Sequence, residues 1–448
     1  MAERFKLIVL DDDPTGSQTV HSCPLLLRWD ASSLRRGLAH PSPLLFVLAN
    51  TRALGADAAR ARVREICRAL KPALAWAQAA GHLDRWMVVS RGDSTLRGHF
   101  PLEVDVLHEE LGPFDATFLA PAFLPGGRTT VDGVHLLDGQ PVHTTPFARD
   151  RLFGYSTSHL PAWVEQKSGG RIPAASVPRL TGAELDAAGS DLEHRLQALP
   201  RGCVVAVDGQ RIEQLQALGT AIHGLSRQGR RFTAQCAASL INGLVPLPPQ
   251  PLSAEGLAAL RRRDALGQPL PGLVLVGSHV PLTDAQLERL LQQSACAGLE
   301  LPVAQVAQHL QDPAQQQLVA ALQSCVLEQL RVQLQAGFTP VLFTSRGELA
   351  CASPEERRRL GLALAGLMAR LVAALTPELG YVISKGGITT HTLLADGLDL
   401  DHVLLQGQLR PGLSLVLAAD LPVVTFPGNL GDGETLLQSW QQLENAHC

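Results

Sequence analysis

Short apolar runs, each followed directly by a polar segment, constrain the fold of this chain more than any other feature of its sequence. In the first 120 residues such runs occur at 5–10, 44–49, 86–89 and 116–120. Runs of this length that are bounded by turn-forming residues are typical of buried strands. A helical pattern at 57–79 lies between two of the runs, and we expect Pro72 to break or kink it. The alternation of strands with helices predicts a parallel α/β sheet.

The polar segments that follow these runs share residue types. They are rich in Asp, Arg, Thr and Gly and lie at 11–19, 50–52, 91–98 and 121–128. In an open parallel sheet ligands bind beyond the carboxyl ends of the strands, so we expect the segments to meet at one edge. Arginine donates paired hydrogen bonds to a carboxylate, and aspartate accepts a proton. The pattern predicts a site for a small polyoxygenated anion, with RGDSTLRG (91–98) as its central loop.

Two aspartates are candidates for the base that such a site needs. Asp12 lies between two other carboxylates, and crowded carboxylates raise one another's pKa. Asp93 lies in the central loop, and the residue pattern does not choose between the two. Arg97 either contacts the ligand or only pairs with Asp93, and Arg128 is either a ligand contact or structural.

Other polar residues are expected to be structural. Asp208 follows a strand and is expected to cap its own loop. His99, His135 and His143 have no metal-ligand spacing, so polar packing or a place in a lid is expected of them. Residues 131–171 are loop-rich and are expected to cover the site or to make a subunit contact, which would form a homodimer.

Length and composition limit the class of protein. A chain of 448 residues is expected to form two or three domains. With 46% hydrophobic and 18% charged residues it is typical of a folded soluble protein. A net charge of −4 and an aromatic content of 4% give no basis for binding nucleic acid or an anionic membrane surface.

The cysteines and the N-terminus favour the cytoplasm as the compartment. The eight cysteines include no C-x-x-C pair, so reduced and buried thiols are expected instead of a metal or disulfide framework. The chain runs from its first residues into a strand with no signal peptide, and no apolar run is expected to span a membrane.

A proline-dense stretch at 244–251 (LVPLPPQP) marks the clearest domain boundary, because it interrupts both helical and strand periodicity. We expect a first domain at 1–243, a linker at 244–271 and a second domain at 272–448. The second domain repeats the pattern of strands that end in polar or glycine-rich segments. Its expected strands are 273–276, 341–343, 381–383 and 423–426.

Two capping boxes are expected to begin helices in the second domain. Thr283 with Gln286 forms one. Ser353 with Glu356 forms the other, with proline at the first helical position and a helix that ends near Leu375.

The strongest signal of the second domain is SKGGITT at 384–390, between a strand and a helical pattern at 391–396. Paired glycines let the backbone approach an anion closely, and a helix start offers unpaired N–H groups. Segments 277–278 and 427–433 also follow strands, and neither matches a P-loop or dinucleotide pattern. We interpret the three segments together as a nucleotide site.

The two halves therefore offer different chemistry. Aspartates and arginines of the first suit a carboxylated polyol, whereas glycine-rich turns of the second suit phosphates. The predicted fold is α/β, with two domains that each have a mainly parallel sheet flanked by helices and with the active site in the interdomain cleft. Such an arrangement suits phosphoryl transfer, in which a carboxylate acts as base and Mg²⁺ bridges the phosphates of ATP.

Six motifs make the chain resemble the four-carbon acid sugar kinase family, whose members act on threonate, erythronate and 3-oxo-tetronates with ATP. The motifs are DDDPTG (11–16), NTR (50–52), RGDSTLRG (91–98), PAFLPGGRTTVDG (121–133), KGGITT (385–390) and FPGNLG (426–431). RGDSTLRG and PAFLPGGRTTVDG together are highly specific. The resemblance implies that the first domain binds the acid sugar and the second binds ATP.

The motifs and the residue chemistry together assign residues to each small-molecule ligand. The acid sugar is expected to contact Asp12, Arg52, Arg91, Gly92, Asp93, Ser94, Thr95, Arg97 and Arg128. ATP is expected to contact Ser278, Lys385, Gly386, Gly387, Ile388, Thr389, Gly428, Asn429, Leu430 and Gly431.

The chain departs from the family pattern at a few positions. Ile388 stands where many members have an acidic residue, so no base or metal-linked role is expected there. Gln235 stands where an arginine is expected, and Asp13-Pro14 and Ser17 alter the usual Asp-Asp-x-Thr-Gly-Ala turn. These departures bear on the substrate more than on the reaction class. The alternatives are a catalytically silent sugar-acid or nucleotide sensor, and another acid-sugar enzyme such as a lyase or dehydrogenase; the absence of a dinucleotide fingerprint counts against a dehydrogenase.

Overall fold

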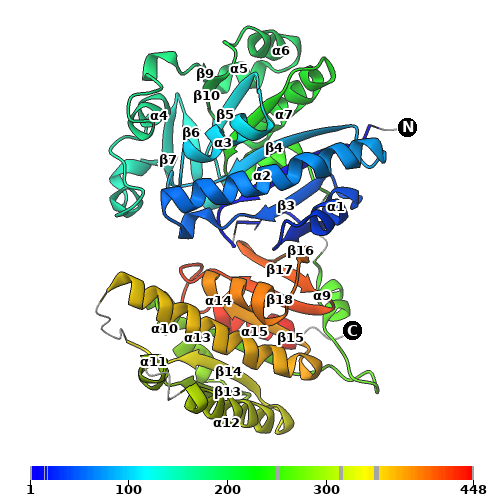
Figure 1. The fold of residues 1–448 in the computed structure, drawn as a ribbon, viewed down its shortest axis with the longest axis vertical. Coiled ribbons are helices and arrows are strands. Elements are labelled where there is room, and N and C mark those ends of the chain that lie inside the picture. The colour runs from blue at the N-terminus through cyan, green and yellow to red at the C-terminus, as the bar shows by residue number, and fades with distance from the viewer. Residues whose placement is uncertain are drawn as a thin grey trace. The chain divides into compact units, whose positions relative to one another are not determined.

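The computed structural model describes residues 3–14, 16–17, 19–248, 250, 252–311, 316–347 and 353–445. The chain divides into two compact units, Met1–Pro249 and Gln250–Cys448, and each has its own sheet and core (Figure 1). The division falls inside the proline-dense stretch. Thr15 and Gln18 of the segment 11–19, and two of the eight cysteines, Cys351 and Cys448, lie outside the described residues.

Within the described part of the first unit, the main sheet has eight strands, and every neighbouring pair is parallel. In sheet order they are β2 (Cys23–Leu26), β3 (Leu44–Leu48), β1 (Phe5–Asp11), β4 (Arg85–Arg91), β11 (Phe232–Cys236), β5 (Ala116–Ala120), β10 (Cys203–Val207) and β9 (Arg179–Leu180). The parallel α/β prediction is confirmed. Three of these strands were not predicted, because β2 contains a proline, β9 has two residues and β11 contains polar residues.

Helices cover both faces of this sheet. They are α1 (Ala31–Ala39), α2 (Ala56–Ala79), α3 (Leu102–Leu111), α4 (Leu160–Lys167), α5 (Gly182–Ala187), α6 (Gly189–Gln197), α7 (Ile212–Arg227) and α8 (Ala238–Leu244). On one face the core joins strand residues Ile8 and Leu45 to Leu34 of α1 and to Ile66 and Leu70 of α2, all completely buried.

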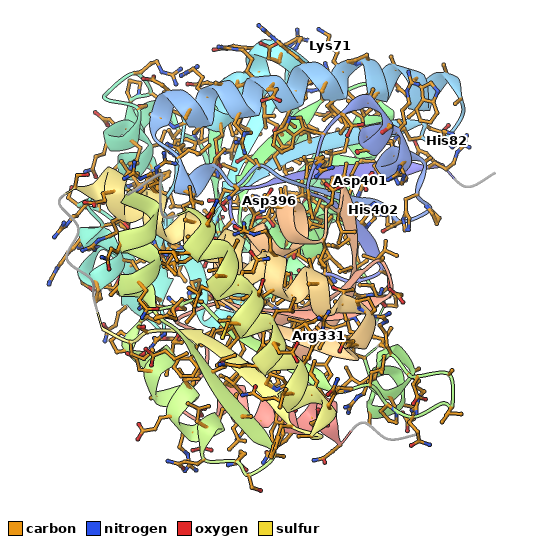
Figure 2. The ribbon with its side chains drawn as sticks, turned by 60° about the horizontal axis from the view of Figure 1, so that its bottom comes forward. Lys71, His82, Arg331, Asp396, Asp401 and His402 are labelled. Atoms are coloured by element: carbon orange, nitrogen blue, oxygen red, sulfur yellow. The ribbon has the colours of Figure 1, made fainter. Side chains whose placement is uncertain are left out.

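The expected break at Pro72 does not occur, since α2 continues through it. Pro72 lies on the exposed side of the helix, whereas the neighbouring Ala73 and Leu74 are buried. Lys71 points away from the unit on this outer side (Figure 2). Burial of the apolar face therefore outweighs the cost of about 3 kcal/mol that an interior proline imposes on a helix.

The excursion at 131–171 contains more regular structure than predicted. β6 (Arg128–Val131), β7 (Val134–Leu137) and β8 (Gln140–Pro141) form a small antiparallel sheet ahead of α4. Tyr155 and Trp163 from this region pack in one buried cluster with Leu96 and Phe100. The excursion thus supports residues 91–98 from the side, which the sequence pattern did not reveal.

In the described part of the second unit, the sheet has seven strands. In sheet order they are β13 (Cys296–Leu301), β14 (Thr339–Thr344), β12 (Gly272–Val276), β15 (Tyr381–Lys385), β18 (Leu421–Phe426), β17 (Leu413–Ala418) and β16 (His402–Arg410). β13, β14, β12, β15 and β18 are parallel to one another, and the hairpin of β17 and β16 adds two antiparallel pairings at one edge. The helices of this unit are α9 (Ala254–Leu260), α10 (Pro281–Leu291), α11 (Val303–Gln311), α12 (Gln316–Gln335), α13 (Pro354–Leu375), α14 (Gly387–Thr392) and α15 (Thr435–Glu444).

Two helix starts differ from the prediction and one agrees with it. Ser353 caps α13, and its side chain accepts a hydrogen bond from the backbone N–H of Glu356 as predicted. The helix expected at 391–396 begins earlier, at Gly387, because Gly386 adopts a φ of +124° that turns the chain directly into α14. The helix near Thr283 begins at Pro281, and no side chain caps it.

Helix α13 corrects the expectation that no apolar run reaches membrane-spanning length. The helical stretch Glu356–Glu378 has 23 residues and contains an 18-residue window with a mean hydropathy of 1.7, so by length and composition alone it could cross a membrane. Its residues Leu367, Met368, Leu371 and Val372 are at most 1% exposed inside the unit. Packing in the core accounts for its apolar face.

The six described cysteines all have free thiols. Cys23, Cys67 and Cys236 are buried as predicted, whereas Cys203 and Cys296 are half-buried. Cys325 is exposed on α12, so the expectation of burial was wrong for this residue.

Helices α7 and α8 meet at a contact that requires glycine. A methyl group on Gly219 would collide with the carbonyl oxygen of Gly243, and one on Gly243 would collide with Leu215. We predict that Gly219→Ala lowers the free energy of unfolding by about 1–3 kcal/mol, because backbone atoms cannot move aside cheaply. Chemical denaturation would measure this.

Gly224→Ala in the same helix is the matched control. A methyl group there meets only the end of the flexible Glu193 side chain. Helix propensity should then make the change neutral or stabilising by up to about 1 kcal/mol. Equal effects of the two substitutions would contradict the close contact between the helices.

Candidate functional site

The carboxyl end of β1 places Asp12 between two arginines. Arg52 donates two hydrogen bonds to the Asp12 carboxylate, from Nη2 at 2.5 Å and from Nε at 2.9 Å. Nη1 of Arg91, the last residue of the neighbouring strand β4, lies 3.4 Å from the same carboxylate. Asp12 is 2% exposed, so this is a buried charge cluster.

Burial is the main influence on the pKa values of the carboxylates in this cluster. It raises the pKa of Asp12, although Arg52 and Arg91 oppose the shift. Burial likewise raises the pKa of Asp11 to about 7, against the effect of Arg91. Crowding by Asp13 contributes less than burial in both cases, so the predicted cause was secondary.

Asp93 is held differently, by its own loop. Burial would raise its pKa, but the charges of Arg52 and Arg97 and hydrogen bonds from Arg97 and Thr95 lower it to about 2. Arg97 Nε donates to Asp93 Oδ2 at 2.7 Å, and the Arg97 guanidinium lies over the Phe147 ring at 4.9 Å. Of the two expected roles of Arg97, the structure shows the ion pair with Asp93.

Backbone carbonyls of residues 91–98 are bound from the small antiparallel sheet and the segment that follows it. His135 contacts the Ser94 carbonyl through Nε2 at 2.8 Å, and the Tyr155 hydroxyl donates to the Thr95 carbonyl at 2.6 Å. Burial lowers the pKa of His135 to about 4, so its ring is neutral near pH 7. Gly92 N–H donates to the Cys236 carbonyl at 2.8 Å. These contacts fix the loop beside β11.

Sequence reasoning missed Glu103, which joins two of the polar segments. Its carboxylate accepts hydrogen bonds from Thr51 Oγ1 at 2.5 Å and from Ser90 Oγ at 2.7 Å. Burial raises its pKa, and the nearby Asp12 adds to the shift. Glu103 lies in the first turn of α3 among other acidic residues, so no sequence pattern marked it.

Arg128 is held by its own turn and by an aromatic ring. The Arg128 guanidinium donates to the Gly126 carbonyl and lies over the Phe123 ring, and among the described residues its Nε has no hydrogen-bond partner. It forms no ion pair with the Asp12 cluster among those residues.

Asp208 accepts hydrogen bonds from the backbone N–H groups of Asp132 and Gly133, so it is structural as expected but holds the turn after β6 and not its own loop.

In the second unit, three neighbouring strands end at one place. β12, β15 and β18 are adjacent and parallel, so Ser278, Lys385 and Gly428 emerge at the same edge. Ser278 N–H donates to the Lys385 carbonyl at 3.3 Å, and Gly386 N–H donates to the Phe426 carbonyl at 2.9 Å. These bonds bring the three predicted segments together.

Thr283 and Gln286 bind a glycine-rich turn instead of forming a capping box. Thr283 Oγ1 donates to the Gly428 carbonyl at 2.9 Å. Gln286 Nε2 donates to the carbonyls of Leu430 and Asp432, at 3.1 and 2.5 Å. The capping-box prediction was wrong because both side chains are used to hold residues 428–432.

Glycine is needed where these segments touch. Gly386 has a left-handed φ of +124°. A methyl group on Gly277 would collide with the Thr389 side chain, and one on Gly428 would collide with Ser278. The glycines therefore leave the backbone of these segments unscreened, whereas larger residues would collide with a neighbour. Gly387 and Ile388 begin α14, and Ile388 is 58% exposed. Asn429 is also exposed, and Leu430 and Gly431 continue its turn.

Lys385 is a buried cation at this edge. Its Nζ donates to the Pro427 carbonyl at 3.1 Å and lies 3.7 Å from the centre of the Phe426 ring. Burial lowers its pKa to about 7. The residue can therefore gain or lose its proton near neutral pH.

Arg346 was not singled out from the sequence. Its Nη2 donates to the Ser278 carbonyl at 2.8 Å and its Nε to Asp284 at 2.6 Å, while Nη1 is buried with no partner among the described residues. The available signal was its position in the polar segment after β14, at the same end of the sheet as Ser278.

Known proteins resemble the chain across both units. A family model described as a sugar-binding N-terminal domain matches residues 7–244, and one described as a nucleotide-binding C-terminal domain matches residues 273–436. A D-threonate kinase of Bordetella bronchiseptica is 27% identical over 97% of this chain and 96% of its own. A D-erythronate kinase of Heliobacterium modesticaldum is 25% identical over 63% of this chain and 59% of its own.

A solved structure from Salmonella typhimurium has the same fold. It aligns with a TM-score of 0.68 and 18% identity over 97% of this chain and 98% of its own. The two family models together span most of the chain, and the first alone spans more than half of it. The chain therefore belongs to the four-carbon acid sugar kinase family, whose members are phosphotransferases with an alcohol group as acceptor.

Proposed function

We propose that this chain is an ATP-dependent kinase that phosphorylates a hydroxyl of a four-carbon acid sugar, of the threonate, erythronate or 3-oxo-tetronate type. The observation that carries the proposal is the buried cluster of Asp12, Arg52 and Arg91 beside residues 91–98, in the unit that matches a sugar-binding domain. The cytoplasm remains the predicted compartment.

The acid sugar has donors available in the first unit. Arg91 Nε and Arg128 Nε are buried and have no hydrogen-bond partner among the described residues. Guanidinium N–H groups of this kind suit a carboxylate. Ser94 adds a hydroxyl for the polyol, whereas the Thr95 hydroxyl already donates to Asp93 and supports the loop. These residues would hold the acid and orient its hydroxyls.

Asp12 is the better candidate for the base. A general base works best when its pKa lies near the working pH, and the pKa of Asp12 is raised by burial, whereas that of Asp93 is about 2. Asp12 would accept the proton of the attacking hydroxyl. Asp93, bonded to Arg97 and Thr95, would instead hold the shape of the loop.

ATP fits the edge formed by Ser278, Lys385, Gly386 and Gly428 in the second unit. Phosphates need backbone that side chains do not screen, and the glycines at this edge leave the backbone unscreened. Lys385 and Arg346 supply positive charge. Mg²⁺ would neutralise phosphate charge and needs few protein ligands, because it retains waters and binds phosphate oxygens.

The proposal predicts stabilisation by nucleotide together with turnover of a four-carbon acid. Saturating ATP-Mg at 100 times its Kd should raise the free energy of unfolding by about 2.7 kcal/mol, measured as a thermal shift. A coupled ADP-release assay with D-threonate, L-threonate, D-erythronate and L-erythronate tests turnover. Stabilisation without turnover of any acid would favour a nucleotide sensor, and no response to ATP would refute the kinase.

Asn substitutions of the two aspartates should separate their roles. Asp12→Asn is expected to lower kcat about 10²–10⁴-fold with the acid still bound, because it removes the proton acceptor. Asp93→Asn is expected to raise KM with a smaller change in kcat. Steady-state kinetics and acid binding by calorimetry measure both. The opposite pattern would make Asp93 the base.

The pH profile adds an independent measurement to this comparison. The base must be ionised, so kcat/KM should fall as the pH drops through the raised pKa of Asp12. The profile of Asp12→Asn should lack that acidic limb, while Asp93→Asn should keep it. An unchanged limb in Asp12→Asn would assign it to another group.

Lys385 predicts a pH dependence of nucleotide binding. Its pKa of about 7 means that it is charged below pH 7 and neutral above, and phosphate favours the charged form. Affinity should therefore fall as the pH rises above 7, by up to about tenfold per unit. Calorimetry with ATP-Mg between pH 6 and 9 measures this fall.

Lys385→Met should flatten the curve of affinity against pH. The titration of ATP itself affects the wild type and the variant equally, so the difference between the two curves reports Lys385. The matched control is Lys71→Met on the exposed face of α2, which should leave the curve unchanged. A curve for Lys385→Met that parallels the wild type would show that Lys385 does not contact phosphate.

A further inference from the structure

Glu103 is a buried carboxylate to which the proposed chemistry assigns no role. It lies in the first turn of α3 and is 3% exposed. The neighbouring residues that α3 turns to the core, Val104, Val106 and Leu107, are apolar and at most 2% exposed. Burial raises the pKa of Glu103, because its charged form loses hydration that an apolar side chain would not need. Side chains that are costly in this way are typical of functional sites.

The position of Glu103 at a helix start does not by itself explain the residue. An acidic side chain in the first turn of a helix is favourable because of the helix dipole. Asp105 carries the same charge in that turn from a more exposed position, where it pairs with Arg171. The dipole therefore does not require a buried carboxylate, and Glu103 directs both of its oxygens at other segments.

The two contacts of Glu103 lie next to the two arginines of the charge cluster at the end of β1. Oε1 accepts a hydrogen bond from Thr51 Oγ1 at 2.5 Å, and Oε2 accepts one from Ser90 Oγ at 2.7 Å. Thr51 immediately precedes Arg52, and Ser90 immediately precedes Arg91. Because β3 and β4 are the two neighbours of β1, one carboxylate joins the segments on both sides of that strand.

Thr51 is held at two of its atoms. Besides the bond from its hydroxyl, its carbonyl oxygen is contacted by His99 Nε2 at 3.1 Å. Thr51 is completely buried and begins the short turn Thr51–Ala53, directly after Asn50 with its φ of +50°. The direction in which Arg52 leaves this turn therefore depends on how Thr51 is held.

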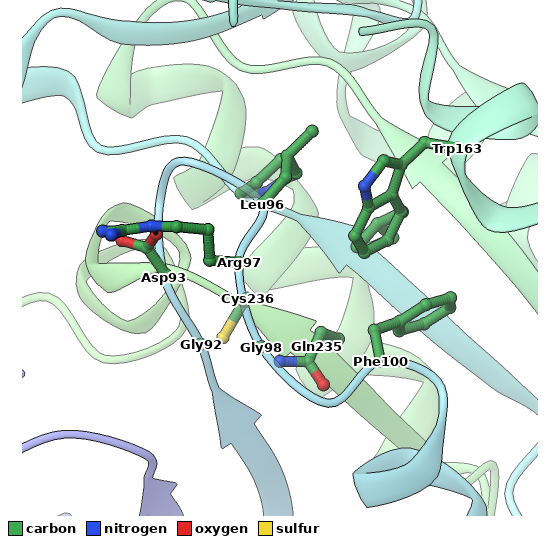
Figure 3. A pocket seen from close by; sticks show the side chains of 11 residues that line it. Gly92, Asp93, Leu96, Arg97, Gly98, Phe100, Trp163, Gln235 and Cys236 are labelled. Atoms are coloured by element: carbon green, nitrogen blue, oxygen red, sulfur yellow. Dashed lines mark hydrogen bonds and ion pairs between the residues drawn. The ribbon is translucent and has the colours of Figure 1, made fainter. Parts of the chain in front are cut away.

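The loop at 91–98 is braced within itself by a different carboxylate. Figure 3 shows the Asp93 carboxylate beside the Arg97 guanidinium, where Arg97 Nε is 2.7 Å from Asp93 Oδ2. That ion pair joins the loop to itself. The bond between Ser90 and Glu103 instead ties the strand that carries the loop to α3. Glu103 therefore acts at the base of the loop.

We propose that Glu103 is a positioning residue for the two arginines that would bind the acid sugar. Through Thr51 it fixes Arg52, and through Ser90 it fixes Arg91. The proposal rests on the proposed function. A guanidinium binds a carboxylate through parallel N–H groups, so its direction matters as well as its charge. A shift of about 1 Å in a positioning group can lower the rate about 100-fold.

The test removes the contacts separately, with ATP-Mg and whichever threonate or erythronate the wild type uses best. Glu103→Leu removes both acceptors, and Thr51→Val and Ser90→Ala each remove one donor. Glu103→Gln keeps both contacts, because its amide accepts from one hydroxyl and donates to the other. The readouts are kcat and KM for the acid and for ATP, with the melting temperature as a check on folding.

Glu103→Leu should lower kcat/KM for the acid about 10- to 100-fold, because the arginines lose their alignment. KM for ATP should stay within about twofold of the wild type, since ATP is assigned to the other unit. Glu103→Gln should restore kcat/KM for the acid to within about threefold of the wild type. A loss of stability alone would produce neither the difference between the two ligands nor the recovery.

Thr51→Val and Ser90→Ala should each lower kcat/KM for the acid by part of the Glu103→Leu factor. Adding Thr51→Val to Glu103→Leu should change it by less than about twofold, because the contact is already lost. Glu109→Leu on the same helix is the matched control. The Glu109 carboxylate is half-exposed and pairs with Arg64, so its loss should change no kinetic constant.

Two results would overturn the positioning role while leaving the kinase assignment intact. Glu103→Leu could leave the kinetics for the acid unchanged, which would show that the arginines are held without it. Glu103→Gln could share the full loss, which would mean that the charge acts and not the hydrogen bonds.

Two further outcomes are also decisive. If Glu103→Leu does not fold, unchanged kinetics for the acid in both Thr51→Val and Ser90→Ala would overturn the positioning role. A wild type that turns over none of the four-carbon acids refutes the proposed function itself, and the role of Glu103 in it.

Discussion

The buried ion pairs of Asp12 are the interaction on which the first unit depends. A carboxylate that is 2% exposed can keep its charge only if cations replace the water that it has lost, and Arg52 and Arg91 do so. Arg52 follows β3 and Arg91 ends β4, so the two cations hold the ends of both neighbouring strands against β1. The charge of Asp12 therefore depends on the strand order, because β3 and β4 lie on either side of β1 and bring Arg52 and Arg91 to the carboxylate.

The second unit differs, because glycines are prominent where its three neighbouring strands end. Its three strand ends present glycines where any side chain would collide with a neighbour. Thr283 and Gln286 hold the turn at 428–432 by its carbonyl oxygens. Lys385 supplies a charge whose presence depends on pH near 7. The match to a nucleotide-binding domain agrees with this arrangement.

Sequence reasoning was most successful where a local pattern decides the structure. Buried strands such as β1 and β5 are short apolar runs bounded by turn residues, and Ser353 with Pro354 is sufficient to begin α13. It failed where distant contacts decide. Pro72 was expected to interrupt α2, but burial of the opposite face maintains the helix. Thr283 and Gln286 have the spacing of a capping box, yet they bind a turn that is more than 140 residues away in the chain.

The amino-acid sequence by itself determined the α/β class, the family and the segments that carry the chemistry, because each of these is encoded in a few consecutive residues. Only the tertiary structure decided how those segments share partners. It paired Arg97 with Asp93 and brought the Glu103 carboxylate into hydrogen bonds with Thr51 and Ser90. These outcomes depend on burial and on which strands are neighbours in the sheet. Both are set by contacts between residues that are far apart in the chain, so no local sequence pattern predicts them.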